Sequence, residues 1–309
     1  MNKIERVRAA LVGAPVDHPP LTLWYHFGLQ HAQADRTVQA HLDFFEAYDF
    51  DWLKVMNDYS YPMPDGIETL DRAADLTRVV PLDLERTPLA TQLDVIERLA
   101  KSLRGRALVV DTMFNAWNTL KRNVVKDAMG VFMREHGEAL DRALAAVNRT
   151  LIDYAHAAFD RGAAGIFLSV PATSESLTRA EFERFMRPHD LALLNAVHGR
   201  DEMTMLHAHG GDLYLDRLLD YPVRALSWAD RDSGPSLATM RAQTALPLIG
   251  GLTHTHFAYA SAATLRAQVR EAIAATGGRG LFLAPGCAIP TYSFPELIRA
   301  VRDESHRPR

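Results

Sequence analysis

Short apolar runs alternate with longer amphipathic segments along the whole chain. The runs are rich in Val, Ile, Leu, Phe and Met, and most of them lack a strict alternation of polar and apolar residues. Parallel strands that are buried on both faces show this pattern. We therefore expect eight strands, at Leu21–His26, Asp51–Met56, Ala107–Phe114, Gly165–Val170, Met203–His207, Ala225–Trp228, Leu246–Gly250 and Gly280–Ala284.

Helical patterns occupy the segments between these runs. Thr178–His198 carries apolar residues at helical spacing, and its Thr178 and Glu181 form a candidate capping box. Gly and Pro mark the limits of further helices, because Gly favours the position after a helix and Pro the first turn. These helices are expected at Ser261–Thr276, at Phe294–Arg302 and, as a pair broken near Gly137, within Lys121–Arg161.

Eight strands that alternate with helices predict an α/β fold, a single (β/α)8 or TIM barrel that forms one domain over residues 1–309. An open doubly wound sheet is the alternative. The segment Asn57–Pro88 follows the second strand and is rich in Pro and Asp, which predicts an enlarged loop. Loops at the carboxyl ends of barrel strands build active sites, so we expect this loop to cover the pocket.

Composition and charge narrow the class of protein. The chain has 309 residues, 48% of them hydrophobic, and a formal net charge of −4. These values exclude a disordered chain and argue against nucleic acid as the main partner. Cys287 is the only cysteine, so an internal disulfide is excluded and a reducing compartment is favoured. Without an apolar run of membrane-spanning length or a signal peptide in Met1–Pro19, we expect a soluble cytoplasmic protein without membrane contact.

Two histidines and the cysteine form the sharpest chemical pattern. His207 and His209 are two residues apart at a strand end, so their side chains point to one side. With Cys287 they make a donor set that zinc accepts, with a fourth position open for a substrate. A chance spacing among 13 histidines and a small buried cysteine is the alternative. A rival ligand set uses His254 and His256 with Cys287.

Polar and aromatic side chains stand at the ends of the other predicted strands. In a barrel, such positions line the active site. Loop hydrogen bonds, helix capping and core packing are the alternatives for each of them. We expect a small-molecule substrate, with catalysis by His26, Asp58 and Asp230 and substrate binding by Trp24, Asn57, Asp111, Asn115 and Ser169.

Several blocks of sequence, in order along nearly the whole chain, resemble the uroporphyrinogen decarboxylase superfamily. The resemblance implies one (β/α)8 barrel, in agreement with the strand count, and its members lead us to expect a homodimer. The blocks are Glu5–Gly13, Pro15–Pro20, Ala163–Ser169, Phe185–Pro188, Leu206–Gly210, Gly250–Leu252 and Leu283–Cys287.

The superfamily resemblance implies one of two chemistries. The decarboxylase itself needs no cofactor and holds substrate carboxylates with paired arginines near the N-terminus, but Trp24–Gly28 here contains no arginine. Other members transfer a methyl group from a methylated corrinoid protein to a thiol at a zinc site with a His-x-Cys motif and a later cysteine. His207 and Cys287 match that site, and His209 replaces its middle cysteine. The chain therefore resembles the methyltransferase branch more closely.

Three functions follow as hypotheses. The first is a zinc-dependent methyltransferase, with a corrinoid, free or on a partner protein, as the methyl donor. The second is a metal-independent decarboxylase that acts on a porphyrinogen-like or smaller carboxylic acid, with Asp58 and His26 in its pocket and His207 as a general acid or ligand. The third is a non-catalytic binder of a corrinoid or tetrapyrrole.

Overall fold

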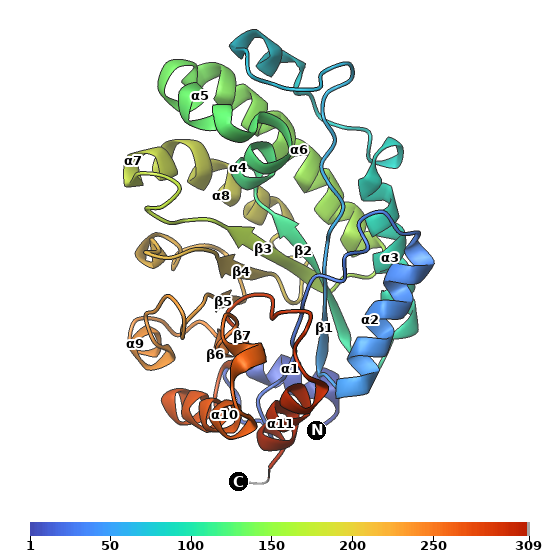
Figure 1. Ribbon diagram of the computed structural model, residues 1–309, viewed down its shortest axis with the longest axis vertical. Coiled ribbons are helices and arrows are strands. Elements are labelled where there is room, and N and C mark those ends of the chain that lie inside the picture. Colours follow the sequence, from blue (N-terminus) through green and yellow to red (C-terminus); the bar gives the residue numbers. More distant parts are fainter. Residues whose placement is uncertain (308–309) are drawn as a thin grey trace.

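Seven parallel strands form one sheet whose order in space follows the order in the chain. The computed structural model describes residues 1–307. The sheet curves around a common interior, with helices outside it (Figure 1). Seven of the eight predicted strands are present, each within two residues of its expected limits. They are β1 (Trp52–Val55), β2 (Leu108–Phe114), β3 (Gly165–Val170), β4 (Met205–Ala208), β5 (Ala225–Ser227), β6 (Leu248–Leu252) and β7 (Leu281–Pro285).

The predicted first strand, Leu21–His26, is reduced to a single bridge. Leu21 pairs in parallel with Leu283 of β7, and the Leu283 N–H donates to the Pro20 carbonyl at 2.8 Å. On the other side, the N–H of Asp51 donates to the Leu21 carbonyl at 2.9 Å, so the segment fills the space between β7 and β1. The pairing ends after Thr22, whose N–H donates to the Leu283 carbonyl at 3.2 Å. The Trp24 carbonyl instead accepts from the N–H of Ile289, in the segment after β7, at 3.0 Å.

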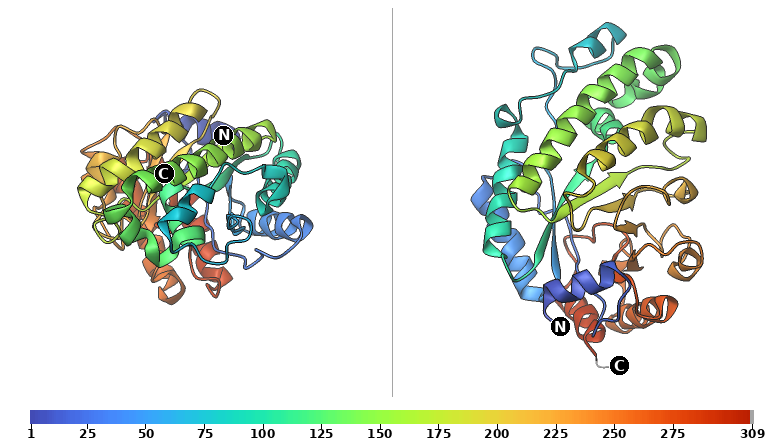
Figure 2. Two further views of the ribbon diagram at one scale, coloured as in Figure 1. Left: turned by 90° about the horizontal axis from the view of Figure 1, so that it is seen from above. Right: turned by 180° about the vertical axis from the view of Figure 1, so that it is seen from behind.

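Helices cover the outer face of the sheet, and the first and last helices, Lys3–Leu11 and Pro295–Ser305, lie at the same end of the molecule (Figures 1 and 2). The longest helix, α6, packs against α3 and α8. Among residues 1–307, no helix combines the length and the apolar character needed to cross a membrane. The helices are α1 (Lys3–Leu11), α2 (Ala34–Tyr48), α3 (Pro88–Ser102), α4 (Ala116–Leu120), α5 (Met129–Glu135), α6 (Gly137–Asp160), α7 (Arg179–Glu181), α8 (Arg187–Val197), α9 (Leu237–Arg241), α10 (Ala262–Thr276) and α11 (Pro295–Ser305).

The helix predictions are confirmed except in one segment. The break near Gly137 is present between α5 and α6, and α10 ends at Gly277, whose φ is 62°. The capping box of Thr178 is also present, but the helix behind it is not continuous. A π-helical turn at Phe182–Met186 separates α7 from α8. Pro188 explains the interruption, because a proline removes a helical hydrogen bond and its ring clashes with the preceding turn.

Two apolar clusters lie on the two faces of the sheet. The larger one joins the outward side chains of the strands to the helices. The smaller one takes one or two side chains from every strand, including Trp52, Phe167 and Phe282, and fills the inside of the curve. Val7 and Ala10 of α1 join this inner cluster, so α1 closes the amino-terminal end of the curved sheet. The carboxyl ends of the strands are left as the open end.

The connection between β1 and α3 spans residues 56–87 and contains two short 3₁₀ turns, Ala73–Arg78 and Leu84–Arg86. It packs against α6, where the hydroxyl of Tyr61 and the N–H of Leu82 both bond to Thr150 Oγ1, at 3.3 and 3.0 Å. Only its first residue, Met56, lines the central cavity. The expectation that this segment covers the pocket is therefore not confirmed, because Tyr61 and the turn Ala73–Arg78 pack against α6 instead.

Candidate functional site

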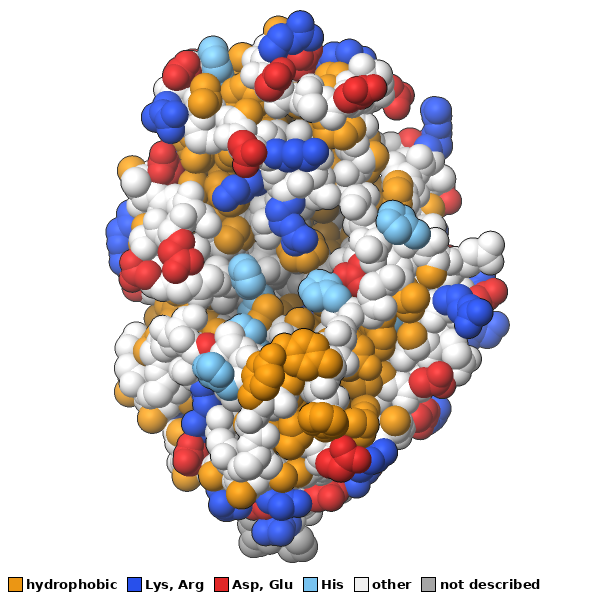
Figure 3. Space-filling view, viewed as in Figure 1, with side chains coloured by type: hydrophobic (Ala, Val, Ile, Leu, Met, Phe, Trp, Pro, Cys, Tyr) orange, Lys and Arg blue, Asp and Glu red, His pale blue; other side chains and the backbone are white. Residues whose placement is uncertain are grey.

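A cavity of about 410 Å³ opens at the carboxyl ends of the strands. Figure 3 shows it as a hollow near the middle of this face, with histidine and Lys or Arg side chains at its edge. Its lining comes from the first segment, from β1 to β4, from the α4 region and from the turn after β7. Its volume is in the range of pockets that bind small molecules. This position and size make it the candidate active site.

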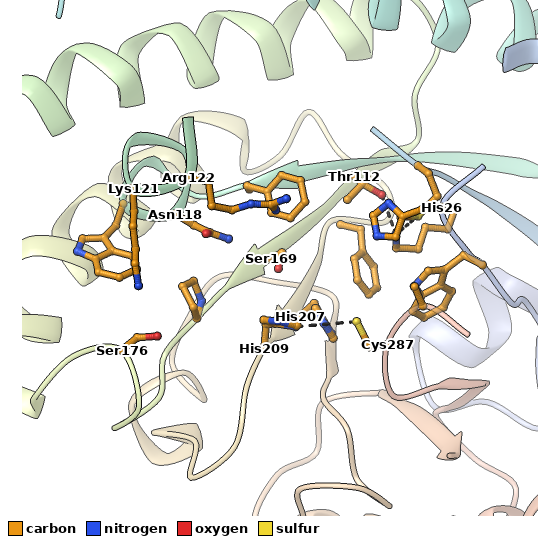
Figure 4. A pocket seen from close by; sticks show the side chains of 18 residues that line it. His26, Thr112, Asn118, Lys121, Arg122, Ser169, Ser176, His207, His209 and Cys287 are labelled. Carbon is orange, nitrogen blue, oxygen red and sulfur yellow. Dashed lines mark hydrogen bonds between the residues drawn. The ribbon is translucent and has the colours of Figure 1, made fainter. Parts of the chain in front are cut away.

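His207, His209 and Cys287 lie together in this cavity, and one ligand atom from each falls within 4.8 Å of the others. Figure 4 shows them as neighbours, with a line between the Cys287 sulfur and His209 Nδ1, which are 3.9 Å apart. His207 belongs to β4 and His209 follows it two residues later, so the strand geometry directs both rings to one side. The turn after β7 supplies the sulfur, 78 residues along the chain.

The local environment keeps both rings in the form that binds metals. Burial lowers the pKa of His207 well below its usual value, and the neighbouring His209 lowers it further. Burial also lowers the pKa of His209. A neutral imidazole has a free nitrogen lone pair, which a metal ion needs. Burial raises the pKa of the Cys287 thiol, so a nearby cation is needed to favour its thiolate.

The ring of His207 is held from two sides. It stacks on Phe167 with 5.3 Å between ring centroids and an interplanar angle of 27°. Its Nδ1 lies 3.1 Å from the Ser227 hydroxyl on β5. A partner on Nδ1 leaves Nε2 as the nitrogen that is free to bind a ligand, the arrangement found around many metal-binding histidines. The donor set, two neutral imidazoles and a thiol, therefore fits zinc with one position left for a substrate.

The rival ligand set is not assembled. The ring Nδ1 of His254 lies 2.8 Å from the Asp232 carboxylate, and the backbone N–H of His254 donates to the same carboxylate at 3.0 Å. His256 is exposed on the loop beyond it. Within residues 1–307, neither histidine joins Cys287 in a group close enough to share a metal ion.

His26 and Asp58 meet at the edge of the cavity. His26 Nδ1 lies 2.5 Å from Asp58 Oδ1, and 54% of the His26 side chain is exposed. His26 lines the cavity, as do Trp24 and Ser169, and Ser169 is opposite His207 in the pairing of β3 with β4. Asp58 stands behind His26 without lining the cavity.

Four other predicted site residues lie outside the cavity lining. Asp111 is fully buried on the outer face of β2, where Tyr154 and Gln92 donate to it at 2.5 and 2.7 Å. The alternation of a strand explains this, because the adjacent Thr112 faces the cavity and Asp111 must then face the helices. The other three are engaged in local bonds: Asn115 caps α4 and bonds to Asp190, Asp230 accepts from Gly251, and Asn57 accepts from Tyr59.

The cavity contains cationic residues that pattern reasoning did not single out. Lys54 of β1 is 4% exposed, and Lys121 and Arg122 follow α4 in a π-helical turn at Lys121–Val125. Figure 4 shows the labelled Lys121 and Arg122 across the cavity from Cys287. The sequence does contain a signal for Lys54, because this lysine stands inside an apolar strand. Lysine is almost never fully buried without a partner or a role.

Comparison with known proteins places this fold and site in context. A family model described as uroporphyrinogen decarboxylase (URO-D) matches residues 57–308, and no curated protein matches the chain. A methyltransferase from Methanosarcina mazei has the same fold, with a TM-score of 0.80, 19% identity and coverage of 98% of this chain and 99% of that chain. A B12-independent methionine synthase from Shewanella sp. W3-18-1, in complex with selenomethionine, has a TM-score of 0.51 and 12% identity, and the match covers 68% and 65% of the two chains.

Proposed function

Since the chain belongs to the uroporphyrinogen decarboxylase family, we propose that it is a (β/α)8-barrel enzyme of this family, and in particular a zinc-dependent methyltransferase. The methyl group would pass between a corrinoid, free or on a partner protein, and a thiol or similar acceptor. The observation that carries the proposal is the convergence of His207, His209 and Cys287 in one cavity. We also propose that the enzyme works in the cytoplasm.

Two further observations support a methyltransferase over the decarboxylase that names the family. The segment from Trp24 to Gly28 has no arginine with which to hold several substrate carboxylates, a task for which bidentate arginines are suited. The full-length likeness to a methyltransferase fold is in keeping with this branch.

Each side chain of the proposed metal site has its own role. His207 and His209 present neutral imidazoles, Cys287 would supply a thiolate once a metal ion is bound, and Ser227 orients the His207 ring. When bound, zinc would act as a Lewis acid that lowers the pKa of an acceptor thiol, so that the sulfur reacts as a thiolate. Trp24 and Phe167 line the cavity and give it an apolar wall, and Phe167 stacks on His207.

His209 changes the charge of this site. Two neutral imidazoles and one thiolate leave a zinc ion with a net charge of +1, whereas a second thiolate would neutralise it. A more electropositive centre lowers the pKa of an acceptor thiol further and makes its sulfur a weaker nucleophile. We therefore expect an acceptor whose thiol is hard to deprotonate in water.

The paired His26 and Asp58 favour a second candidate function. The Asp58 carboxylate contacts Nδ1 and so orients the His26 ring, and a histidine held in this way at the cavity edge suits proton transfer. A metal-independent decarboxylase acting on a porphyrinogen-like or smaller carboxylic acid would use this pair. Turnover that survives complete chelation of metal would favour it.

The metal content of the untagged protein tests the first function. We expect about one zinc per chain, lost in His209→Ala and in Cys287→Ser because three protein ligands are needed to hold the ion. His256→Ala is the matched control, since this histidine is exposed and outside the cluster, and it should keep its zinc. No zinc, or zinc unaffected by the two site changes, would refute the proposal. A positive result leads to assays with methylcobalamin and thiols.

A further inference from the structure

The candidate active site is cationic and lacks acidic side chains. Lys54, Lys121 and Arg122 line the cavity together with three histidines. No Asp or Glu is among the described residues that line it. A cavity with several positive groups and no carboxylate attracts anions and repels cations.

Aromatic rings, and not carboxylates, hold each of these three cations. The Lys54 nitrogen lies 4.8 Å from the ring centroids of both Trp24 and Phe167. Two more rings support the other cations: Lys121 lies 4.9 Å over Trp117, and the Arg122 guanidinium lies 4.6 Å over Phe114. An aromatic ring attracts a cation without neutralising it, so the positive charges stay available to a ligand.

Lys54 is the most unusual member of the set. Its ammonium group donates to Thr112 Oγ1 at 2.7 Å and to the Met56 sulfur at 3.1 Å. An ammonium group has three N–H donors, so one donor remains. In the part of the chain that the structure describes, no carboxylate lies within ion-pair distance of Lys54. A buried cation without a carboxylate partner is costly, which is a reason to look for a ligand that completes the pair.

The strand geometry points Lys54 into the cavity. Lys54 and Trp52 are two residues apart on β1, so they share a face, and Trp52 belongs to the inner cluster. The Phe167 ring that contacts the Lys54 ammonium group also stacks on His207, and Cys287 lines the same cavity. A small molecule in this cavity can therefore meet the cluster and Lys54 at once.

We propose that Lys54 determines substrate specificity by binding a carboxylate of the methyl acceptor, while Lys121 and Arg122 attract that anion toward the cavity. The acceptor is then a small mercapto acid rather than a neutral thiol. That the acceptor carries a thiol rests on the proposed function. That it also carries a carboxylate rests on the charges of the cavity alone.

Calorimetric titration with matched ligands tests this specificity. We expect the zinc-loaded protein to bind 3-mercaptopropionate about ten- to hundredfold more tightly than 2-mercaptoethanol, the range for a hydrogen bond between charged groups. Lys54→Met should remove most of this preference, and Lys54→Arg should retain part of it. Lys126→Met is the control, because Lys126 is exposed on the same connection as Arg122 and does not line the cavity. Equal preference in the parent and in Lys54→Met would overturn the inference.

A ligand without a thiol separates this inference from the proposed function. Propionate and neutral 1-propanol are titrated into Cys287→Ser, which lacks the sulfur ligand, and into Cys287→Ser combined with Lys54→Met. Propionate binding that depends on Lys54 would support the carboxylate site. It would do so even if the parent holds no zinc, and that absence of zinc would refute the methyltransferase. Zinc in the parent without any preference for an anion would refute the carboxylate site and leave the methyltransferase standing.

Discussion

The Nδ1 atom of His207 lies 3.1 Å from the hydroxyl of Ser227, the residue opposite it on strand β5. The register of two neighbouring strands thus orients the ring on which the candidate metal site depends. Ser169 of β3 is opposite His207 on the other side, so three neighbouring strands form one row of polar side chains, of which Ser169 and His207 line the cavity. This row is built by backbone pairing, which is more rigid than a loop.

Ser227→Ala should weaken zinc binding without unfolding the protein. Removing the partner of a metal-binding histidine lowers metal affinity about 10- to 100-fold, because the ring loses its preferred orientation and tautomer. Competition with a chromophoric chelator measures the affinity. Ser169→Ala removes the same hydroxyl from the opposite neighbour and should leave the affinity close to that of the parent. Equal affinities in the two variants would show that Ser227 does not orient the ligand.

Gly286→Ala should disturb the turn that carries Cys287. A Cβ atom at Gly286 would lie 2.5 Å from Ala229 Cα and 3.0 Å from Ala229 Cβ, so the backbone must move. We expect the zinc content to fall well below one per chain. Gly130→Ala is the control, because its Cβ meets only the tip of Arg134 at 3.4 Å and a helical Gly→Ala change stabilises by about 0.5–1 kcal/mol. Full zinc occupancy and an unchanged Tm in Gly286→Ala would contradict this account.

Lys54→Met should stabilise the protein while it removes anion binding. Burial lowers the pKa of Lys54 to about 7, so at neutral pH the folded state disfavours the proton that the unfolded state keeps. Methionine fits a buried site between aromatic rings, and it lacks this penalty. We expect an increase in the free energy of unfolding of about 1 kcal/mol or more at pH 7, measured by urea denaturation. A less stable variant would mean that the Lys54 hydrogen bonds outweigh the cost of its burial.

The stability of the fold should fall as the pH rises from about 4 to 7, in part through Asp190. Burial raises the pKa of Asp190 to about 7, although Asn115 and Tyr221 donate to its carboxyl group at 2.8 and 3.1 Å. Between these pH values the folded protein keeps the Asp190 proton, whereas the unfolded chain has released it. The contribution of Asp190 to the free energy of unfolding is therefore fully present below the pKa of Asp190 in the unfolded chain. It is lost as the pH rises through the pKa of Asp190 in the folded protein.

Asp190→Asn tests this by its Tm at several pH values. The amide cannot ionise, so the slope of Tm between pH 4 and 7 should become flatter than in the parent. Asp216→Asn provides the comparison, because the contact of exposed Asp216 with Arg179 lowers its pKa and its titration falls below this range. A slope in Asp190→Asn as steep as in the parent would assign the pH dependence to another group.

Local sequence was sufficient for the elements of this fold. Continuous apolar runs place seven strands within two residues, because a strand buried on both faces needs such a run wherever it lies in the sheet. The same holds for the Thr178 capping box and the stop at Gly277, which depend on neighbours three or four residues away. The two-residue spacing of His207 and His209 likewise predicts one side for both rings.

Tertiary structure decided which side chains reach the cavity. Asp111 and Thr112 are both polar residues in an apolar run, and only the packing of α3 and α6 shows that Asp111 faces outward. The apolar run around Lys54 indicates burial, but its place in the cavity is seen only from its contacts with the rings of Trp24 and Phe167, which come from distant segments. A run that is apolar on both faces carries no periodic signal for its orientation, and contacts across many residues exist only once the chain has folded.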